Sequence, residues 1–230
     1  MRRLAAVLLC CLPLPLLAAR PFIVDDARVV DRGACQVESW VKHTPGGQEW
    51  WALPACNPFG VELTAGGGAL FGGPGDRDHA DYQFQAKVLA RPLETNAWGW
   101  GVAAGAIRHA DINVRQNLWG NYYFYVPVSR SFADDRLVLL FNAGGIDSRD
   151  DRRRGLSYGV GAEIYLTPRF MIATEAYGAT GFDRFSQLGF RLWLVPERVQ
   201  IDSTYGFQLN GPHRTEWVTL GFRLISRPFF

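Results

Sequence analysis

Charged side chains recur at alternate positions within otherwise apolar stretches, a spacing that gathers them on one face of a β-strand. Such a mixed row of carboxylates, ammonium and guanidinium groups can line a water-filled path and select what passes by charge. It can equally close a narrow interior by ion pairing, because an isolated buried charge is costly. The sequence leaves both interpretations open for the predicted lumen set, which is Glu38, Lys42, Glu62, Lys87, Glu163, Glu175, Arg191, Asp202 and Arg223.

A further acidic pair, Asp25 and Asp26, precedes the first predicted strand in a segment, residues 20–33, that is too polar to face lipid. If this segment enters the lumen, the pair is expected to meet Lys87, Arg191 or Arg223 and to plug the interior. The alternative is a periplasmic tail in which the aspartates form local turns. The sequence does not decide between them.

Cys35 and Cys56 flank a turn signal, Thr44-Pro45-Gly46-Gly47, that lies midway between them. A hairpin folded there brings the two cysteines opposite each other, where a cross-strand disulfide would fix the register. A redox-active pair would need CxxC spacing or a nearby base, and the sequence has neither. We therefore predict a structural disulfide, formed in an oxidising compartment.

Residues 147–154 form a densely charged predicted loop. The arginine side chains match the geometry of phosphate oxygens, which favours contact with lipopolysaccharide, although an ordinary solvated loop is the alternative. The arginines concerned are Arg149, Arg152, Arg153 and Arg154. The acidic stretch 76–81 lacks the full spacing of a calcium loop, so we predict neither a metal site nor a cofactor.

Catalysis by a barrel at the membrane would need a serine, a histidine and an orienting carboxylate or amide close together. No GxSxG motif is present, and the histidines fall in or beside predicted outer loops; they are His43, His79, His109 and His213. We predict that the protein is not an enzyme and keep a lipid-modifying enzyme as an alternative function.

These side chains must be positioned by strands. The period-2 pattern predicts twelve segments of about 10 to 12 residues, the length that a tilted membrane strand requires. They are Cys35–His43, Glu49–Ala55, Phe59–Leu70, Asp81–Pro92, Ala97–Arg108, Asn117–Val128, Leu137–Gly145, Leu156–Leu166, Phe170–Gly178, Phe185–Val195, Val199–Leu209 and Thr215–Ser226. Ten strands remain an alternative because segments such as Glu49–Ala55 are short.

Connections between the segments alternate between short turns and, in general, longer polar loops, which is typical of outer-membrane barrels. The turn at residues 129–136 is longer than others of its class. Polar residues fall on the face assigned to the lumen and apolar residues on the other, the reverse of a water-soluble barrel. We expect aromatic residues near strand ends to form interfacial girdles; these are Trp40, Trp50, Trp51, Trp98 and Trp217. The predicted fold class is all-β, a transmembrane antiparallel up-and-down β-barrel of about twelve strands.

The ends of the chain and its charge agree with this assignment. Residues 1–19 have the charged start, short apolar run and small-residue cleavage site of a signal peptide, which predicts export through the periplasm. An amphipathic last strand followed by a terminal Phe230 is typical of substrates of the barrel assembly machinery. Without Arg2 and Arg3, basic residues equal the 22 acidic ones, and nothing points to nucleic acid. The predicted parts are the signal peptide, the segment 20–33 and a barrel at 34–230.

The stretch Arg20-Pro21-Phe22-Ile23-Val24-Asp25-Asp26-Ala27, followed by Gly33 and Glu38, resembles a family of outer-membrane β-barrels named for the meta-pathway of phenol degradation. The chain has Val24 where that family often has threonine, and the cysteine pair is not typical of it. The resemblance covers about 20 residues and implies a bacterial outer-membrane barrel that takes up small, aromatic solutes.

Three functions follow as expectations. The first is a channel for passive uptake of a small solute, aromatic by resemblance alone. The second is a closed structural or surface-interaction barrel with an ion-paired interior, in contact with outer-membrane lipid. The third is the lipid-modifying enzyme.

Overall fold

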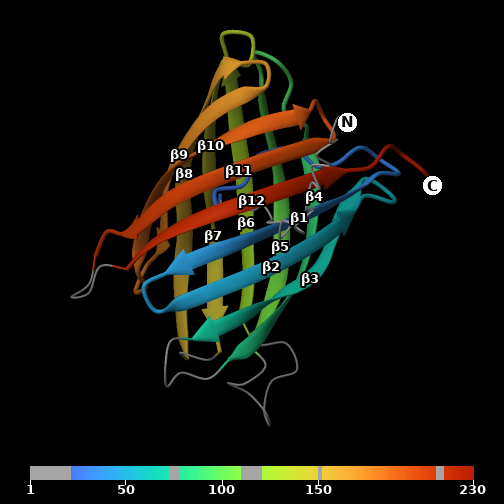
Figure 1. Cartoon of the computed structure of the whole chain (residues 1–230). Helices are drawn as coiled ribbons and strands as arrows, with labels where there is room; N and C mark the ends of the chain where they lie inside the picture. The colour runs from blue at the N-terminus through green and yellow to red at the C-terminus, as the bar shows by residue number, and fades with distance from the viewer. Residues whose placement is uncertain (1–21, 73–77, 110–120, 150–151, 211–214) are drawn as a thin grey trace, which may run out of the picture.

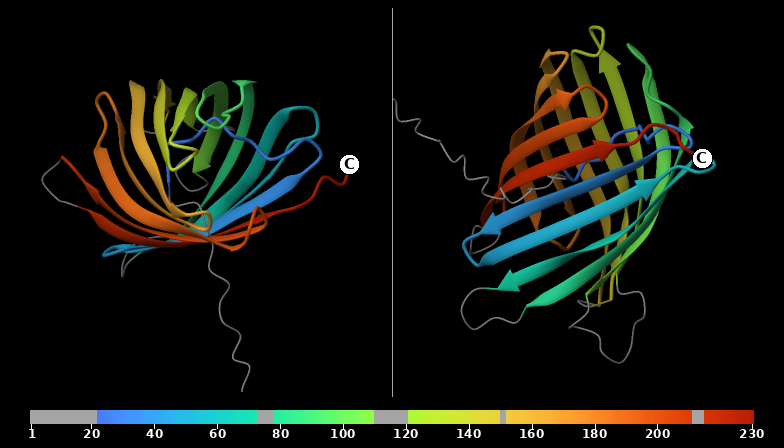
Figure 2. Two further views of the ribbon diagram at one scale, coloured as in Figure 1. Left: turned by 90° about the horizontal axis from the view of Figure 1, so that it is seen from above. Right: turned by 45° about the vertical axis from the view of Figure 1, so that its right-hand side comes forward.

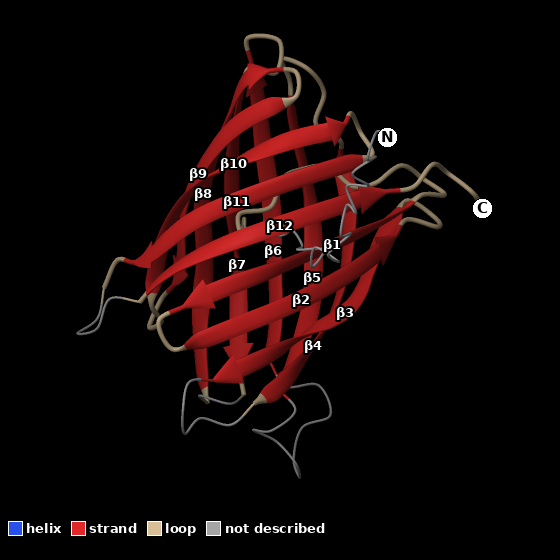
Figure 3. Ribbon diagram, in the orientation of Figure 1, coloured by secondary structure: helices blue, strands red, loops and turns tan. Residues whose placement is uncertain are grey.

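The computed structural model describes residues 22–72, 78–109, 121–149, 152–210 and 215–230. In these residues the chain forms twelve strands, and Figure 3 shows strands and loops alone, without a helix. None of the described residues forms a helix that is long and apolar enough to cross a bilayer. The strands are β1 Cys35–Thr44, β2 Gly47–Cys56, β3 Val61–Gly72, β4 His79–Arg91, β5 Trp98–His109, β6 Asn121–Phe132, β7 Leu137–Ser148, β8 Arg153–Thr167, β9 Phe170–Ala179, β10 Arg184–Val195, β11 Val199–Gln208 and β12 Glu216–Ile225.

Each strand pairs antiparallel with its neighbours in sequence, and β1 pairs with β12 to close the barrel. In Figure 1 strands β10–β12 and β1–β3 run obliquely across the front, while β5–β8 stand nearly upright behind them. We call the end that carries the connections 57–60, 92–97, 133–136, 168–169 and 196–198 the turn end, and the opposite end the loop end. Closure leaves no unpaired sheet edge.

The two faces of the sheet differ as the alternation predicts. On β8, Leu156 and Val160 point outward and are 68% and 51% exposed, whereas Glu163 points inward and is 3% exposed. On β11, Asp202 and Thr204 point inward and are almost fully buried. An apolar outside around a polar inside is the arrangement of a barrel whose surroundings are less polar than its interior.

The strands begin and end within three residues of the predicted ranges, with β6 as the exception. β6 runs on to Phe132, because Ser129 and Ser131 continue the inward alternation instead of opening a loop; both are fully buried. The connection to β7 is consequently the short stretch 133–136, in which Ala133, Asp134 and Asp135 all have positive φ. The predicted long turn at 129–136 was therefore wrong.

The prediction for the tryptophans was wrong for three of the five. Trp50 and Trp98 point outward and are 39% and 43% exposed. Trp217 points inward, is 6% exposed and donates its indole N–H to Gln187 Oε1 at 3.2 Å. Trp40 and Trp51 also lie on the inward face, where their rings stack at a centroid distance of 5.6 Å. Strand alternation overrides the girdle preference, because these three residues share parity with inward charged residues of the same strands, which are Glu38 on β1, Glu49 on β2 and Arg223 on β12.

The N-terminal segment, residues 22–34, lies inside the ring of strands, as the blue trace in Figure 2 shows. It joins β1 through Gly33, whose φ of +82° and close approach to the Phe230 carbonyl leave no room for a Cβ atom. The Gly33 N–H donates to the Asn57 carbonyl, and the Gly33 carbonyl accepts from the Phe229 N–H. The segment is thus fixed at the turn end. The predicted signal peptide, residues 1–19, lies outside the described residues.

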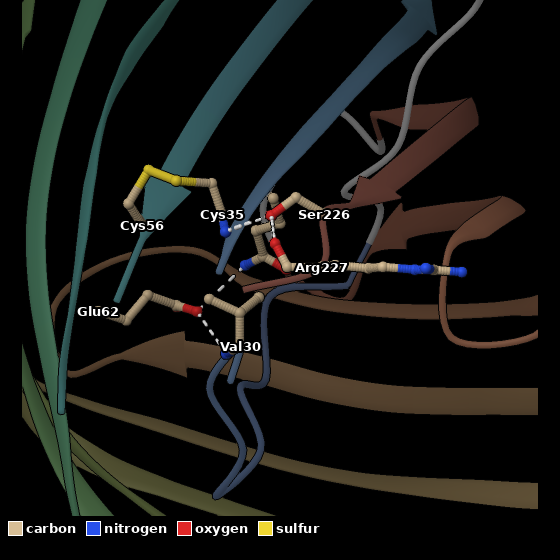
Figure 4. The surroundings of a disulfide bond; sticks show 7 residues. Val30, Cys35, Cys56, Glu62, Ser226 and Arg227 are labelled. Atoms are coloured by element: carbon tan, nitrogen blue, oxygen red, sulfur yellow. Dashed lines mark hydrogen bonds between the residues drawn. A yellow bond between two sulfur atoms is a disulfide. The ribbon is translucent and has the colours of Figure 1, made fainter. Parts of the chain in front are cut away.

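The predicted disulfide is present. Cys35 and Cys56 face each other in the register of β1 and β2, with Cα atoms 4.0 Å apart. Figure 4 shows the bridge beside the start of β1, where the Cys35 N–H donates to Ser226 Oγ at 2.8 Å. The same view shows Val30 of the N-terminal segment donating to Glu62. The bridge therefore joins β1 to β2 at the point where the segment leaves the barrel wall.

Removal of this disulfide is expected to destabilise the barrel without changing its architecture. Closing a loop of this size lowers the conformational entropy of the unfolded chain, which stabilises the folded state by about 3 kcal/mol. We expect Cys35→Ser/Cys56→Ser to lower the free energy of unfolding in lipid vesicles by about that amount, measured by guanidinium titration. Reduction of the wild-type protein should produce the same shift, and a change below about 0.5 kcal/mol would contradict a stabilising role.

Candidate functional site

The N-terminal segment crosses the lumen with its backbone held by side chains of the wall. Its amide groups lack a strand partner there, and buried N–H groups need acceptors. The Ile23 and Val24 N–H groups donate to the two oxygens of Glu175, at 2.7 and 2.9 Å. Further along, Asp25 donates to Asn142 Oδ1 and Ala27 donates to Ser129 Oγ.

Apolar side chains of the segment also pack against the wall. Phe22 contacts Met171 and Ala173 of β9, and Val24 packs between Val138 and Leu140 of β7; all of these side chains are buried. Gly159 makes room for Val24, since a Cβ atom there would lie 2.7 Å from Val24 Cγ2. The segment therefore fits the lumen by shape as well as by hydrogen bonding.

The acidic pair of the segment lies against cations. Lys87 Nζ is 2.9 Å from Asp25 Oδ1 and 3.8 Å from Asp26 Oδ1. Arg28 of the segment pairs with Asp26 at 2.8 Å and reaches Glu163 of the wall at 3.1 Å. Burial alone would raise the pKa of the Asp26 carboxyl, but Arg28 and Lys87 hold it well below its ordinary value. Burial acts to lower the pKa of Arg28, and Asp26 and Glu163 raise it above its ordinary value.

Two of the predicted cations pair with the wall instead of with the acidic pair. Arg191 Nη1 lies 3.2 Å from Glu163 and its Nε lies 3.5 Å from Asp202. Arg223 Nε lies 3.4 Å from Glu38. The expectation that the aspartates meet a cation thus holds in the structure for Lys87, while neither arginine forms a described ion pair with them.

The remaining members of the predicted lumen set are also inside the barrel. Lys42 lies near the loop end and pairs with Glu49 at 2.8 Å. Glu62 is buried, accepts from the Val30 N–H at 3.0 Å and lies opposite Lys87 in the register of β3 and β4. All nine charged residues predicted from strand parity therefore lie on the inward face, and Glu49, which the prediction left out, lies there as well.

Little space is left around the segment at the level of these charges. A cavity of about 50 Å³ remains, lined by both segment and wall, with Asp26, Glu163 and Arg191 among its lining residues. That volume holds a few water molecules. The described residues consequently leave little room for a solute at this level.

A larger cavity of about 380 Å³ opens above the segment, between the loop-end halves of the strands. We call it the vestibule. Its floor is Phe22, Ile23 and Val24 of the segment, and Ile23 is 56% exposed. Aromatic and aliphatic side chains dominate its walls, among them Trp40, Ile107, Tyr123, Tyr125, Tyr177 and Phe185. The volume and apolar lining are those of a site for a small ring-bearing molecule.

Hydrogen bonds connect the vestibule wall to the segment beneath it. Gln83 donates to Tyr123 OH at 3.0 Å, and Tyr123 OH in turn donates to Gln85 Oε1 at 3.0 Å. Tyr125 OH donates to Asp25 Oδ2 at 2.7 Å and lies 3.2 Å from Gln85 Oε1. Asp25, which pairs with Lys87, is thus also the last member of a hydrogen-bonded row of polar side chains along the vestibule.

Sequence reasoning missed the neutral anchors Ser129 and Asn142. Each has the parity of the inward face, which would have placed it in the lumen. No local signal links it to the segment, because the contacts span more than 100 residues for Ser129 and Asn142.

The predicted lipopolysaccharide-contact arginines lie at the loop end, where residues 150–151 are outside the described part. Arg149 and Arg154 lie 3.5 and 3.2 Å from Asp147. The Arg153 guanidinium stands over the Phe182 ring at 4.5 Å. These contacts leave Arg154 81% exposed, and Arg152 is exposed as well.

Solved structures of outer-membrane proteins share this fold. The NanC porin aligns with a TM-score of 0.59 and 10% identity, over 84% of this chain and 100% of that chain. The COG4313 outer membrane channel from Pseudomonas putida F1 aligns with a TM-score of 0.56 and 12% identity, over 87% and 98%. The outer membrane protein Omp33 from Acinetobacter baumannii gives 0.51 and 9%, over 83% and 96%. At such low identity the similarity establishes the closed twelve-strand architecture alone.

No curated protein sequence matches the chain. The model of one protein family, described as "Uncharacterised conserved protein UCP029691", matches residues 6–225. That match covers nearly the whole chain, which therefore belongs to this family.

Proposed function

We propose that the protein is a bacterial outer-membrane channel for passive uptake of small solutes, closed in the described conformation by its N-terminal segment. The observation that carries the proposal is a polar lumen obstructed by one extended segment that is not part of the barrel wall. Every hydrogen bond from the segment to wall side chains can be exchanged for water when the segment withdraws. The fold shared with outer-membrane channels supports the same function.

The vestibule supports an aromatic solute. Its rings present apolar faces at spacings suited to stacking, as between Tyr177 and Phe185, whose centroids lie 5.5 Å apart. Tyrosine hydroxyls and glutamine amides on the opposite wall provide hydrogen bonds. The resemblance of residues 20–27 to the phenol-degradation barrels favours the same class of solute.

The orientation proposed here places the turn end and both described termini in the periplasm and the loop end outside the cell. The outward apolar side chains then face outer-membrane lipid. In this orientation the level of the lipopolysaccharide phosphates coincides with four arginines, Arg149, Arg152, Arg153 and Arg154. Recognition of Phe230 by the barrel assembly machinery stays a prediction. Phe230 lies beyond the end of β12 at Ile225 and is 61% exposed.

A closed structural barrel is the second candidate. It is favoured by the dense contacts of the segment, which leave a cavity of only about 50 Å³ at the charged level. The lipid-modifying enzyme has no described site: His43 is exposed, and the side chains of His79, His109 and His213 lie outside the described residues.

Solute uptake into proteoliposomes tests the channel and its preference for rings. We expect a variant lacking residues 22–32 to admit phenyl glucoside faster than methyl glucoside, because the ring gains contacts in the vestibule. Phe185→Ala in that background should lower this preference by about 2- to 10-fold, as one aromatic pair contributes about 0.5–1.5 kcal/mol.

The matched control is Phe190→Ala, which removes an outward ring on the same strand. Equal uptake of both glycosides would contradict the aromatic preference. If neither glycoside enters through the correctly folded variant, the structural barrel is favoured.

A further inference from the structure

Glu175 is held in an unusual way for a buried carboxylate of the lumen. It is 4% exposed, and its two oxygens accept the adjacent Ile23 and Val24 N–H groups of the N-terminal segment. A third donor is the Gln187 side-chain amide, at 2.7 Å from Oε1. Two parallel N–H donors on one carboxylate reproduce the fork by which a guanidinium or amidinium binds.

Three other buried or half-buried carboxylates of the wall pair with a cation of the wall itself. Glu38 pairs with Arg223, while Glu163 and Asp202 share Arg191. Glu62 lies opposite Lys87 in the register of β3 and β4. Glu175, by contrast, has no cation within ion-pair distance among the described residues. Glu175 loses two backbone donors when the segment leaves, and Gln187 is then its one remaining described donor.

Glu175 also stands at the junction of the two cavities. It lines the small charged cavity around the segment, and Tyr177, two residues further along the same face of β9, lines the vestibule. A cationic group bound at Glu175 would therefore extend its attached body past the Tyr177 ring into the apolar vestibule. Aromatic faces also attract cations directly.

Building on the proposed channel function, we propose that Glu175 is the solute-recognition residue of the open path. It takes the N–H donors of a cationic head group, an amidinium, guanidinium or primary ammonium, attached to an aromatic or apolar body. In the closed state the amides of Ile23 and Val24 occupy this site. The segment is thus a competitor of the solute as well as an obstruction.

The test uses the full chain and the probe benzamidinium, which carries an amidinium on one ring. Ile23→Pro/Val24→Pro removes both amide donors and leaves the charges of the segment unchanged. We expect calorimetry of the folded protein in detergent to show at least tenfold tighter benzamidinium binding to this variant than to the wild type. Adding Glu175→Gln should abolish that gain, whereas adding Glu49→Gln, a lumen carboxylate already paired with Lys42, should leave it within about twofold.

A second comparison needs no change at Glu175. Benzamide, the uncharged analogue of the probe, should bind the proline variant at least tenfold more weakly than benzamidinium does. Equal binding of the two probes, equal binding with and without Glu175→Gln, or no gain from the proline substitutions would each overturn the proposal. Folding is verified by heat-modifiable migration on gels. Binding is read without conductance, so a silent pore with intact benzamidinium binding would count against the channel and not against the site.

Discussion

Deletion of residues 22–32 is expected to convert a silent protein into one with steady single-channel conductance. The segment fills the lumen at the level of Lys87 and Arg191 and leaves room there for only a few waters. Its removal joins the vestibule to the turn end through a space lined by charged and amide side chains, which hold water. Planar-bilayer recordings of the refolded wild type and deletion variant measure the difference directly.

The matched control replaces residues 22–32 with a glycine-serine stretch of equal length, which keeps the chain connected without its anchors. We expect this control to flicker between open and closed, because an unanchored chain enters the lumen only transiently. A correctly folded deletion variant that stays silent would show that the wall itself closes the interior. The structural barrel would then be the better description.

Lys87→Met is expected to give the second largest effect, a rise of about 30-fold in the ratio of open to closed states. Lys87 is 3% exposed and binds both aspartates of the segment. Loss of one partner from a buried pair costs about 3–5 kcal/mol, and we expect solvation from the adjacent cavity to reduce this to about 2 kcal/mol. That free energy corresponds to the stated factor. Open probability in single-channel recordings is the measurement.

Lys42→Met is the control for the loss of a lumen lysine, since its partner Glu49 belongs to the wall and not to the segment. The double variant Lys87→Met/Asp25→Leu should close again in part, because removing both charges avoids leaving one of them unpaired. An open probability unchanged by Lys87→Met would mean that shape and backbone hydrogen bonds alone hold the segment.

The sequence was sufficient to predict the barrel because alternation acts locally. Leu156 and Glu163 lie seven residues apart on one strand, and their opposite parity alone assigns them to opposite faces. The disulfide followed in the same way, since the turn signal midway between the cysteines sets their register. Features determined within one strand or one hairpin could therefore be predicted from the sequence.

Features that depend on packing between distant parts of the chain could not be predicted from the sequence. The inward tryptophans were misassigned because residue type was given more weight than parity, and the hydrogen bond from Trp217 to Gln187 on another strand could not be foreseen locally. The extension of β6 was missed because Ser129 and Ser131 are typical turn residues, and Ser129 is held here as an acceptor for Ala27. Charge complementarity suggested that the segment enters the lumen, but it did not identify the amide fork on Glu175.

The closure of β1 on β12 has a consequence for the order of assembly. The partners in this ladder, such as Gln36 and Ile225, are separated by nearly the whole chain. The ladder therefore closes the longest loop of the barrel, and we expect it to form last. The N-terminal segment continues directly into β1, one of the two strands of that seam. Its anchors Glu62, Ser129, Asn142 and Glu175 lie on strands that pair before closure. The nascent sheet can therefore receive the segment on its open concave face, and the final pairing encloses it without threading.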